Sequence, residues 1–420
     1  MSLRKLLLGG LLGVVGLSPA MASPAQSLFD QATFFIGFYY NGPAKVPNFR
    51  ELRQRYQGQL EQACRGLGEQ CGYEQARGVI LRIIEDLGDP FTTLLSAEEE
   101  QEASRLGAGL GPVAPWIGVW VRPGTGGLVV VESFPGEAAY RAGLRRGDVI
   151  TQVGGQMATP QALRAAERSQ QPFTLSYSRQ GQIQRVEVRG SLSRESLQPR
   201  LELQGGVAYL RVYHLYYSER FSVAERVHQL VRQAEQEGAR GIVLDLRDSL
   251  TGIDDEALLA ANAFLPKAGF VYDWRFKNLD DTFSAEGGKV YVQGEGETER
   301  VAVREVANPV QSSLPLVVLV NRNTFNSAEM LAYFLQAAGR AKVVGEASAG
   351  ALGVSGNADN ALINGEFLAV SSIRMKNLDG SPFPLKLTPD VVVSDDLEAL
   401  AQGRDVVLEK AREVLGIGNR

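Results

Sequence analysis

The chain has 420 residues, 44% of them hydrophobic, and a formal charge of −5. This length is sufficient for two or three domains with ordinary apolar cores, and the slightly acidic balance argues against nucleic acid as the main partner. The two cysteines and two histidines do not have the spacing of a zinc site. We therefore expect no metal and no other cofactor.

Residues 1–22 have the form of a cleavable secretion signal. Arg4 and Lys5 precede an apolar stretch at 6–17, and residues 20–22 read Ala-Met-Ala, an A-x-A cleavage site. The stretch is too short for a spanning helix, which needs about 18 apolar residues, and no later stretch is that long. We expect an exported protein, periplasmic or extracytoplasmic, with no membrane span after signal removal; an uncleaved anchor is the alternative.

Residues 23–110 are predicted to form a helical N-terminal region. Apolar residues recur at three- and four-residue spacing in 49–64 and 73–87, which predicts two antiparallel helices. The string Gly88-Asp89-Pro90 is expected to end the second of them, and Ser96 to cap an acidic helix at 97–105.

The two cysteines, Cys64 and Cys71, lie close together near the turn between those two helices. In an oxidising compartment a disulfide would clip that turn. Two ordinary thiols are the alternative, because spacing alone does not test the geometry of a bridge.

Residues 114–190 show short strands and glycine turns. The string PGEAAYRAGLRRGDVITQVGG, which begins at Pro135, gives a short helix, a turn and a strand in the order of a PDZ domain, which residues 116–190 resemble over their full length. The resemblance implies that backbone N–H groups of Ile117, Gly118 and Val119 receive a peptide's terminal carboxylate while the peptide adds as a strand. A PDZ fold that only packs against its neighbour is the alternative.

Residues 195–420 alternate between strands and helices, which predicts an α/β domain. Strands are expected at 207–213 and 241–247, helices at 218–237 and 254–264, a hairpin within 270–304, two strands within 361–375 and a terminal helix at 397–415. In the middle, an apolar strand at 316–320 leads through a polar elbow at 321–326 into a helix. Such elbows at the carboxyl ends of strands are where α/β proteins usually place their chemistry.

Several strings occur in the order of the C-terminal processing proteases, also called tail-specific proteases: LGDPFTTLL, GIVLDLRDSLTGIDDEA, LVVLVNRNTFNSAEMLA, GRAKVVGEASAG and LTPDVVV. The chain resembles this family over essentially the whole sequence after residue 22. The resemblance implies an α+β multidomain fold with a helical region, a PDZ domain and a peptidase domain with a ClpP/crotonase-like core. It also implies polypeptide C-termini as partners, and a homo-oligomer or an active relative as a possible assembly.

Active members of the family use a serine nucleophile at the elbow, in a run like T-A-S-A-A-E, and a lysine base whose pKa is lowered by burial. When Glu329 is aligned with the glutamate of that run, Asn326 falls at the nucleophile position. Carrying the register to the loop that reads T-F-G-K-G in the family places Ala351 at the base position.

Two further parts of the family's machinery are altered. A related branch takes its base from a histidine in an L-x-D-x-H-T string, where this chain has Phe91. The oxyanion loop, N-P-G-G in many members, is here 249–252, which keeps Gly252 but loses one glycine. Asn326 remains a good helix cap with Glu329. These residues predict a pseudoprotease that binds or regulates.

The alternative is an active serine endopeptidase that uses relocated residues. Ser327 follows the nucleophile position, although a helical step of about 100° turns its hydroxyl away from the usual line of attack. His214, predicted near the carboxyl edge of the sheet, is its candidate base, whereas Lys342 is expected to be solvated. A third interpretation is that Asn326 or Ala351 was introduced to trap a substrate.

Overall fold

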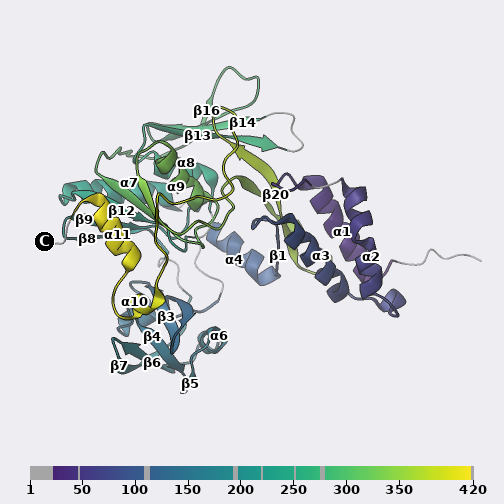
Figure 1. The fold of residues 1–420 in the computed structure, drawn as a ribbon, viewed down its shortest axis with the longest axis horizontal. Coiled ribbons are helices and arrows are strands. Elements are labelled where there is room, and N and C mark those ends of the chain that lie inside the picture. The colour runs from purple at the N-terminus through teal and green to yellow at the C-terminus, as the bar shows by residue number, and fades with distance from the viewer. Residues whose placement is uncertain are drawn as a thin grey trace, which may run out of the picture.

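The computed structural model describes residues 22–45, 48–107, 114–192, 197–218, 221–249, 252–274 and 280–417. Its mixture of helices and sheets confirms the α+β expectation. Figure 1 shows a helical group at one end, a small β-rich unit below, and a larger α/β body. The predicted signal, apart from Ala22, lies outside the described residues, and none of the helices within them is long and apolar enough to cross a membrane.

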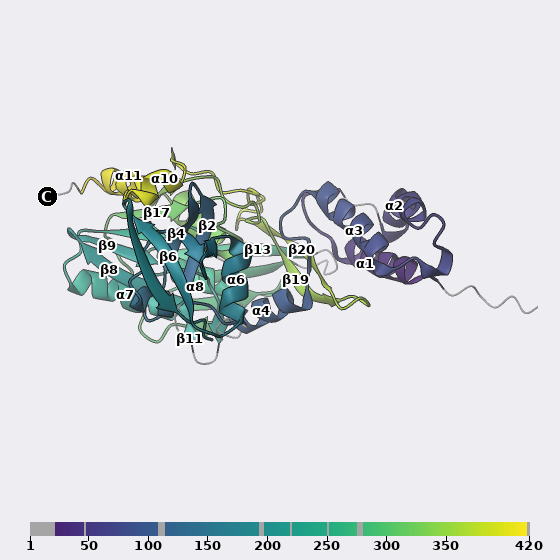
Figure 2. The same cartoon turned by 90° about the horizontal axis from the view of Figure 1, so that it is seen from below.

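The helical group consists of α1 (Pro24–Tyr39), α2 (Phe49–Ala63) and α3 (Tyr73–Leu87). As predicted, α3 ends at Gly88, which adopts a left-handed conformation with φ 64° and donates its N–H to carbonyls of the last turn. The core of this group also includes Leu368 of β20 (Phe367–Lys376). Both views show β20 extending from the body to these helices (Figures 1 and 2).

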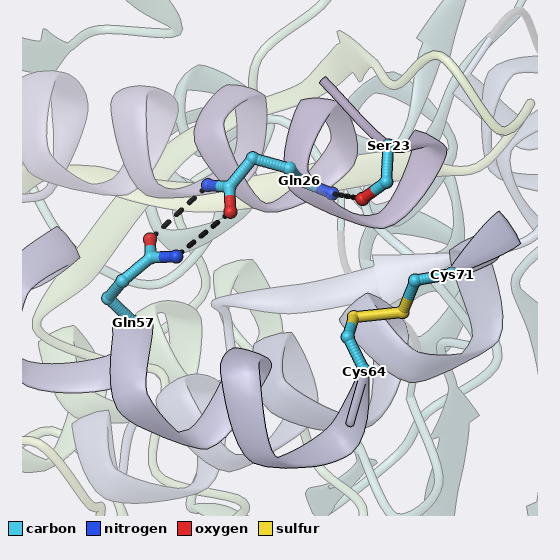
Figure 3. The surroundings of a disulfide bond; sticks show 5 residues. All are labelled: Ser23, Gln26, Gln57, Cys64 and Cys71. Carbon is cyan, nitrogen blue, oxygen red and sulfur yellow. Dashed lines mark hydrogen bonds between the residues drawn. A yellow bond between two sulfur atoms is a disulfide. The ribbon is translucent and has the colours of Figure 1, made fainter. Parts of the chain in front are cut away.

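A disulfide joins Cys64, just after α2, to Cys71, just before α3, with a Cα–Cα distance of 5.4 Å. Beside it, the Gln26 and Gln57 side chains exchange two hydrogen bonds of 2.9 and 3.2 Å (Figure 3). A short loop of this kind contributes roughly 2–3 kcal/mol in the chain-entropy description. The bridge thus fastens the turn that the sequence predicted.

The segment after α3 begins with β1 (Thr93–Leu95), followed by α4 (Ala97–Gly107). Ser96 and Glu99 form a reciprocal capping box, in which each residue's N–H donates to the other's side chain, over 2.8 and 3.2 Å. The predicted cap is therefore confirmed, and the helix runs two residues further than expected.

The β-rich unit is a six-stranded sheet in the order β2-β3-β4-β6-β7, with β5 paired to β4. Its strand β2 lies at one edge and pairs only with β3. Two helices accompany the sheet, and the first is shorter than the predicted 135–144 because Glu137 and Ala142 bound it. The elements are β2 (Val119–Gly124), β3 (Gly127–Ser133), α5 (Ala138–Arg141), β4 (Val149–Val153), β5 (Gln156–Met157), α6 (Pro160–Arg168), β6 (Phe173–Arg179) and β7 (Gln182–Val188).

The α/β body contains a sheet in the order β21-β18-β17-β12-β9-β8, parallel except for the edge strand β8. One core packs α7, α8 and α9 against the sheet, and a second core packs α11 against its other face. The strands are β8 (Arg200–Gln204), β9 (Val207–Arg211), β12 (Gly241–Asp245), β17 (Leu316–Val320), β18 (Lys342–Gly345) and β21 (Val391–Val392). The helices are α7 (Val223–Gln236), α8 (Asp254–Ala261), α9 (Ser327–Ala337) and α11 (Val406–Leu415).

Three helix predictions in this body were too long. The helix predicted at 254–264 ends at Ala261, and Asn262 is its C-cap. The helix α7 begins at Val223 because Ser222 caps it, and the preceding residues form the short pair β10 (Tyr217–Ser218) and β11 (Phe221–Ser222). The terminal helix is divided into α10 (Leu397–Ala401) and α11. Between them, Gly403 has φ +86°, and Asp405 caps the second helix.

The hairpin predicted within 270–304 is part of a larger, separate sheet. Four strands form a meander that continues through β20 to β1, with β19 paired to β20. The turn predicted at Asn364-Gly365 does join β19 and β20, but β19 begins at Val354, seven residues before the prediction. The strands are β13 (Lys267–Trp274), β14 (Asp281–Glu286), β15 (Lys289–Gln293), β16 (Val301–Glu305), β19 (Val354–Ala361) and β20 (Phe367–Lys376).

Candidate functional site

The elbow between β17 and α9 places Asn326 directly before the first turn of the helix. Its backbone has φ 48° and ψ −109°, which is unusual for a residue other than glycine and costs on the order of 1–3 kcal/mol. Its side-chain Nδ2 donates to the carbonyls of Val354 and Ala351, over 2.9 and 3.3 Å. The amide at the predicted nucleophile position therefore fastens the elbow to the loop opposite it.

Glu329 holds the same loop from the first turn of α9. Its buried carboxylate accepts the N–H groups of Asn326, Gly350 and Ala351, over 2.7, 2.9 and 3.0 Å, and the hydroxyl of Ser348. Burial raises the pKa of Glu329, and these four hydrogen bonds act in the opposite direction. Ala351, the predicted base position, is buried and carries only a methyl group, so no proton acceptor stands there.

Ser327, the alternative nucleophile, is fully buried. Its hydroxyl lies 3.0 Å from Oδ1 of Asp254 and 3.2 Å from Oδ1 of Asn326. Asp254 begins α8 and also accepts the hydroxyl of Tyr272. Burial raises the pKa of Asp254 to about 6, which the bonds from Tyr272 and Ser327 oppose. The Ser327–Asp254 contact was not foreseen from the sequence.

His214, the alternative base, follows β9 and accepts the N–H of Tyr216 through Nδ1, over 3.1 Å. Burial lowers the pKa of His214 to about 4. Within the described parts of the chain, no hydrogen bond joins His214 to Ser327. Lys342 is paired with Asp390 over 2.9 Å at an exposed position, as expected of a solvated amine.

The predicted oxyanion loop, 249–252, is described only at its ends, and Leu250 and Thr251 lie outside the described residues. Ser249 accepts the N–H of Phe325 from the elbow, over 3.2 Å. Gly252 forms a β-bridge with Leu215, and a Cβ on this glycine would lie 2.3 Å from the Leu215 backbone. Close packing alone is sufficient reason for a glycine there. The turn at Phe91 is tied by Asp89, which also accepts the hydroxyl of Ser371 over 2.7 Å.

A network of charged side chains joins the β-rich unit to the carboxyl end of the parallel sheet. Arg247 binds Asp245 and Asp405, over 2.7 and 2.9 Å. From the other side, Arg122 of β2 binds Asp395, over 3.0 Å, and Asp248. The pKa of Asp245 is held well below its usual range by Arg247 and Arg211, against its burial. Charged residues at the ends of apolar strands were the only sequence signal for this contact.

The predicted peptide-binding residues form the loop that enters β2. Ile117 donates its N–H to Oε1 of Glu167, over 3.0 Å. Its carbonyl accepts the N–H of Ala139, and the carbonyl of Gly118 accepts the N–H of Phe134. Gly118 has φ +82°, and a Cβ there would lie 2.0 Å from the Glu137 side chain, so this glycine is required by the packing. The contact with Glu167 was not predicted from the sequence.

No metal centre is evident in the part of the chain that the structure describes, since no group of three or more His, Cys, Asp or Glu side chains there could hold an ion. The elbow and the loop at 117–119 are the two candidate sites that the sequence predicted.

The segment that contains the elbow matches a known protein family. Residues 206–393 match peptidase family S41. The chain is 29% identical over 292 residues to the carboxyl-terminal-processing protease of Synechocystis sp., and 24% identical over 280 residues to the carboxy-terminal processing protease CtpA of Bacillus subtilis. These matches cover 66% and 65% of the chain, and only 61% and 54% of the two relatives.

Two solved structures share the fold. One is the photosystem II D1 C-terminal processing protease, with a TM-score of 0.50 and 20% identity over 94% of this chain and 98% of that one. The other is a putative S41 protease from Bacteroides fragilis, with a TM-score of 0.54 and 16% identity over 80% and 88%. Residues 206–393 therefore form a peptidase family S41 domain, and the chain is similar in sequence to carboxyl-terminal processing proteases.

Proposed function

We propose that this protein is an exported pseudoprotease that captures the C-termini of unfolded or extended polypeptides without cleaving them. The observation that carries the proposal is the state of the elbow. Asn326 stands where the family has its serine, and its amide nitrogen donates to the carbonyls of Ala351 and Val354. An amide nitrogen shares its lone pair with the carbonyl, so it does not act as the nucleophile of acyl transfer.

The base position supports the same proposal. A serine hydroxyl needs a neighbouring group to take its proton, and the methyl group of Ala351 offers none. The backbone N–H of Ala351 is engaged by Glu329, over 3.0 Å. The polar groups of the elbow are thus hydrogen-bonded to one another, which suits a structural role and leaves them unavailable to a substrate.

The β-rich unit supports the capture of peptides. Its edge strand β2 pairs on one side only among the described strands, and an added peptide strand needs such an edge. The loop at Ile117, Gly118 and Val119 precedes that edge, where a peptide's last residue would lie. The disulfide at Cys64 and Cys71 agrees with export to an oxidising compartment. A homo-oligomer or an assembly with an active relative is also part of the proposal. Light scattering, which measures the mass of the assembly, tests it.

A residual serine peptidase is the second candidate, and one observation favours it. The Ser327 hydroxyl lies 3.0 Å from a carboxylate, Asp254, whose pKa burial raises to about 6. A carboxylate of that pKa is a plausible general base. Against this, Ser327 is fully buried and His214 is bonded elsewhere.

One experiment separates the two candidates. The purified protein is incubated with an unfolded polypeptide that ends in apolar residues, and fragments are sought by mass spectrometry. We expect none from the wild type, and cleavage only after Asn326→Ser is combined with Ala351→Lys. Fragments from the wild type that disappear in Ser327→Ala would contradict the pseudoprotease proposal.

Capture is tested separately with a fluorescent peptide and its amidated twin. If the loop at Ile117 receives a terminal carboxylate, the free acid binds at least about tenfold more tightly, since a hydrogen-bonded charge contributes about 1.5–3 kcal/mol. Equal affinity for both peptides would refute carboxylate capture and leave the conclusion about cleavage intact.

A further inference from the structure

A carboxylate of the chain itself lies on the loop proposed to receive a peptide's carboxylate. Glu167, near the end of α6, accepts the N–H of Ile117 through Oε1, over 3.0 Å, and only 8% of its surface is exposed. Ile117 is the first of the three residues whose N–H groups are expected to bind a C-terminus. The internal carboxylate and the proposed ligand are therefore competitors for the same donor.

The position of Glu167 is set by the packing of its helix. Thr159 caps α6 by accepting the N–H of Ala162, over 3.1 Å, and Leu163 anchors the helix in the core of the β-rich unit. At the other end, a Cβ on Gly190 would lie 2.5 Å from the carbonyl of Glu167, so the chain after β7 closes tightly over the helix end. The helix that carries the Glu167 side chain is thus held in a fixed position beside Ile117.

Few groups near Glu167 stabilise its ionised form. Burial raises its pKa to about 7, while the Ile117 N–H and the charge of Arg164, on the same helix, act in the opposite direction. The next residue, Arg168, pairs with Glu98 of α4. Across the loop, the charged side chain packed against Gly118 is another acid, Glu137. A peptide carboxylate that arrived here would form a like-charge pair with an ionised Glu167, and such pairs retain a proton.

We propose that Glu167 is an internal gate of the carboxylate-binding loop, and that a peptide C-terminus is captured only when Glu167 leaves the Ile117 N–H or takes up a proton. This inference rests on the proposed capture function and adds its regulation. The ligand class is a polypeptide with a free α-carboxylate, and the competitor is part of the protein.

Because of this gate, the affinity of the protein for a peptide C-terminus depends on pH in a defined direction. A terminal carboxylate is ionised above about pH 4, and Glu167 is neutral below about 7. Binding is therefore strongest in the mildly acidic range. Above pH 7 each captured peptide takes up one proton, so the affinity falls up to about tenfold per pH unit.

The test uses the full chain and one peptide ending in apolar residues, as free acid and as amide, with fluorescence anisotropy at pH 6, 7 and 8. Glu167→Gln removes the charge and keeps the shape, and Glu167→Ala removes the competitor. Glu187→Gln, an exposed position on β7 at the opposite edge of the sheet, is the matched control. Thermal unfolding verifies that each variant is folded.

We expect both Glu167 variants to bind the free acid about tenfold more tightly than wild type at pH 8. The pH dependence between 6 and 8 is expected to vanish in both, while the control behaves as wild type and the amide is unaffected. A wild type that prefers the free acid at every pH, with affinities matched by both variants, would overturn the gate and leave capture standing. Weaker binding by Glu167→Ala would also overturn it. If no variant prefers the free acid, capture itself fails, and the gate fails with it.

Discussion

Two buried carboxylates, Glu329 at the elbow and Glu167 beside the β-rich unit, each accept backbone N–H groups from a loop distant in sequence. Glu329 receives three N–H groups and one hydroxyl, whereas Glu167 receives a single N–H. Hydrogen bonds to charged groups contribute about 1.5–3 kcal/mol each. The number of donors therefore separates a carboxylate that is a permanent part of the structure from one that a ligand is able to displace.

The two sites differ in the hydrogen-bond donors that they still offer to a ligand. At the elbow, the groups that a substrate would meet are already used by Glu329 and Asn326. At the loop, one exchange of partners frees a donor beside an edge strand. The substitutions that test this difference most directly change the number of hydrogen bonds that each carboxylate accepts.

The largest effect is expected from Glu329→Gln. The amide replaces one carboxylate oxygen with an NH₂ group, so two buried donors lose their acceptor. These are the N–H groups of Asn326 and Ala351 if the NH₂ takes the place of Oε2, or the Gly350 N–H and the Ser348 hydroxyl if it takes the place of Oε1. At about 1–3 kcal/mol for each, the variant should lose about 4 kcal/mol of unfolding free energy, measured by urea denaturation. Glu346→Gln is the control, because its pair with Arg322 lies at the surface and its loss should cost under about 1 kcal/mol. Equal losses for the two variants would contradict a structural role for the hydrogen bonds to Glu329.

A smaller effect is expected for Glu167→Gln, in the pH dependence of stability. Burial raises the pKa of Glu167 to about 7 in the folded protein, against about 4.3 when unfolded. The stabilisation is therefore complete below about pH 4 and is lost as pH rises through about 7. From pH 5 to 8 the wild type should lose on the order of 2 kcal/mol through this group, and the variant should not.

Asp254→Asn is the matched variant for that measurement, since burial also raises the pKa of Asp254, to about 6. Asp254→Asn should remove a separate part of the fall in unfolding free energy with pH, at a lower pH than Glu167→Gln does. A wild-type slope that neither substitution reduces would show that both groups titrate as they do in the unfolded chain.

The smallest effect is expected for Ser327→Ala. Its hydroxyl is one of the groups bonded to Asp254, and the bond from Tyr272 remains. We expect a loss of about 1 kcal/mol in urea denaturation and no change in any reaction with polypeptides. Tyr272→Phe, which removes the other hydroxyl, should cost a similar amount. A much larger loss for Ser327→Ala would mean that Asp254 depends on this serine.

The sequence predicted the local elements well, because their signals lie within a few residues. Ser96 with Glu99 marked the start of α4, Gly88 marked the end of α3, and the apolar run before Asn321 marked β17 and its elbow. The errors occurred where a local signal was missed, as at Ser222 and Gly403. The alignment of residues at the elbow was likewise a short-range inference.

What the sequence by itself determined was the order of the elements, the resemblance to a peptidase family, and the residue types at the elbow and in the loop opposite it. Only the tertiary structure decided which groups meet. Glu167 and Ile117 are 50 residues apart, and Ser327 and Asp254 are 73 apart. The single sheet that joins the 267–305 meander to β1 and β20 is also a long-range result. The physical reason is that helix and strand periodicity depends on neighbouring residues, whereas the partner of a buried carboxylate depends on the path of the whole chain.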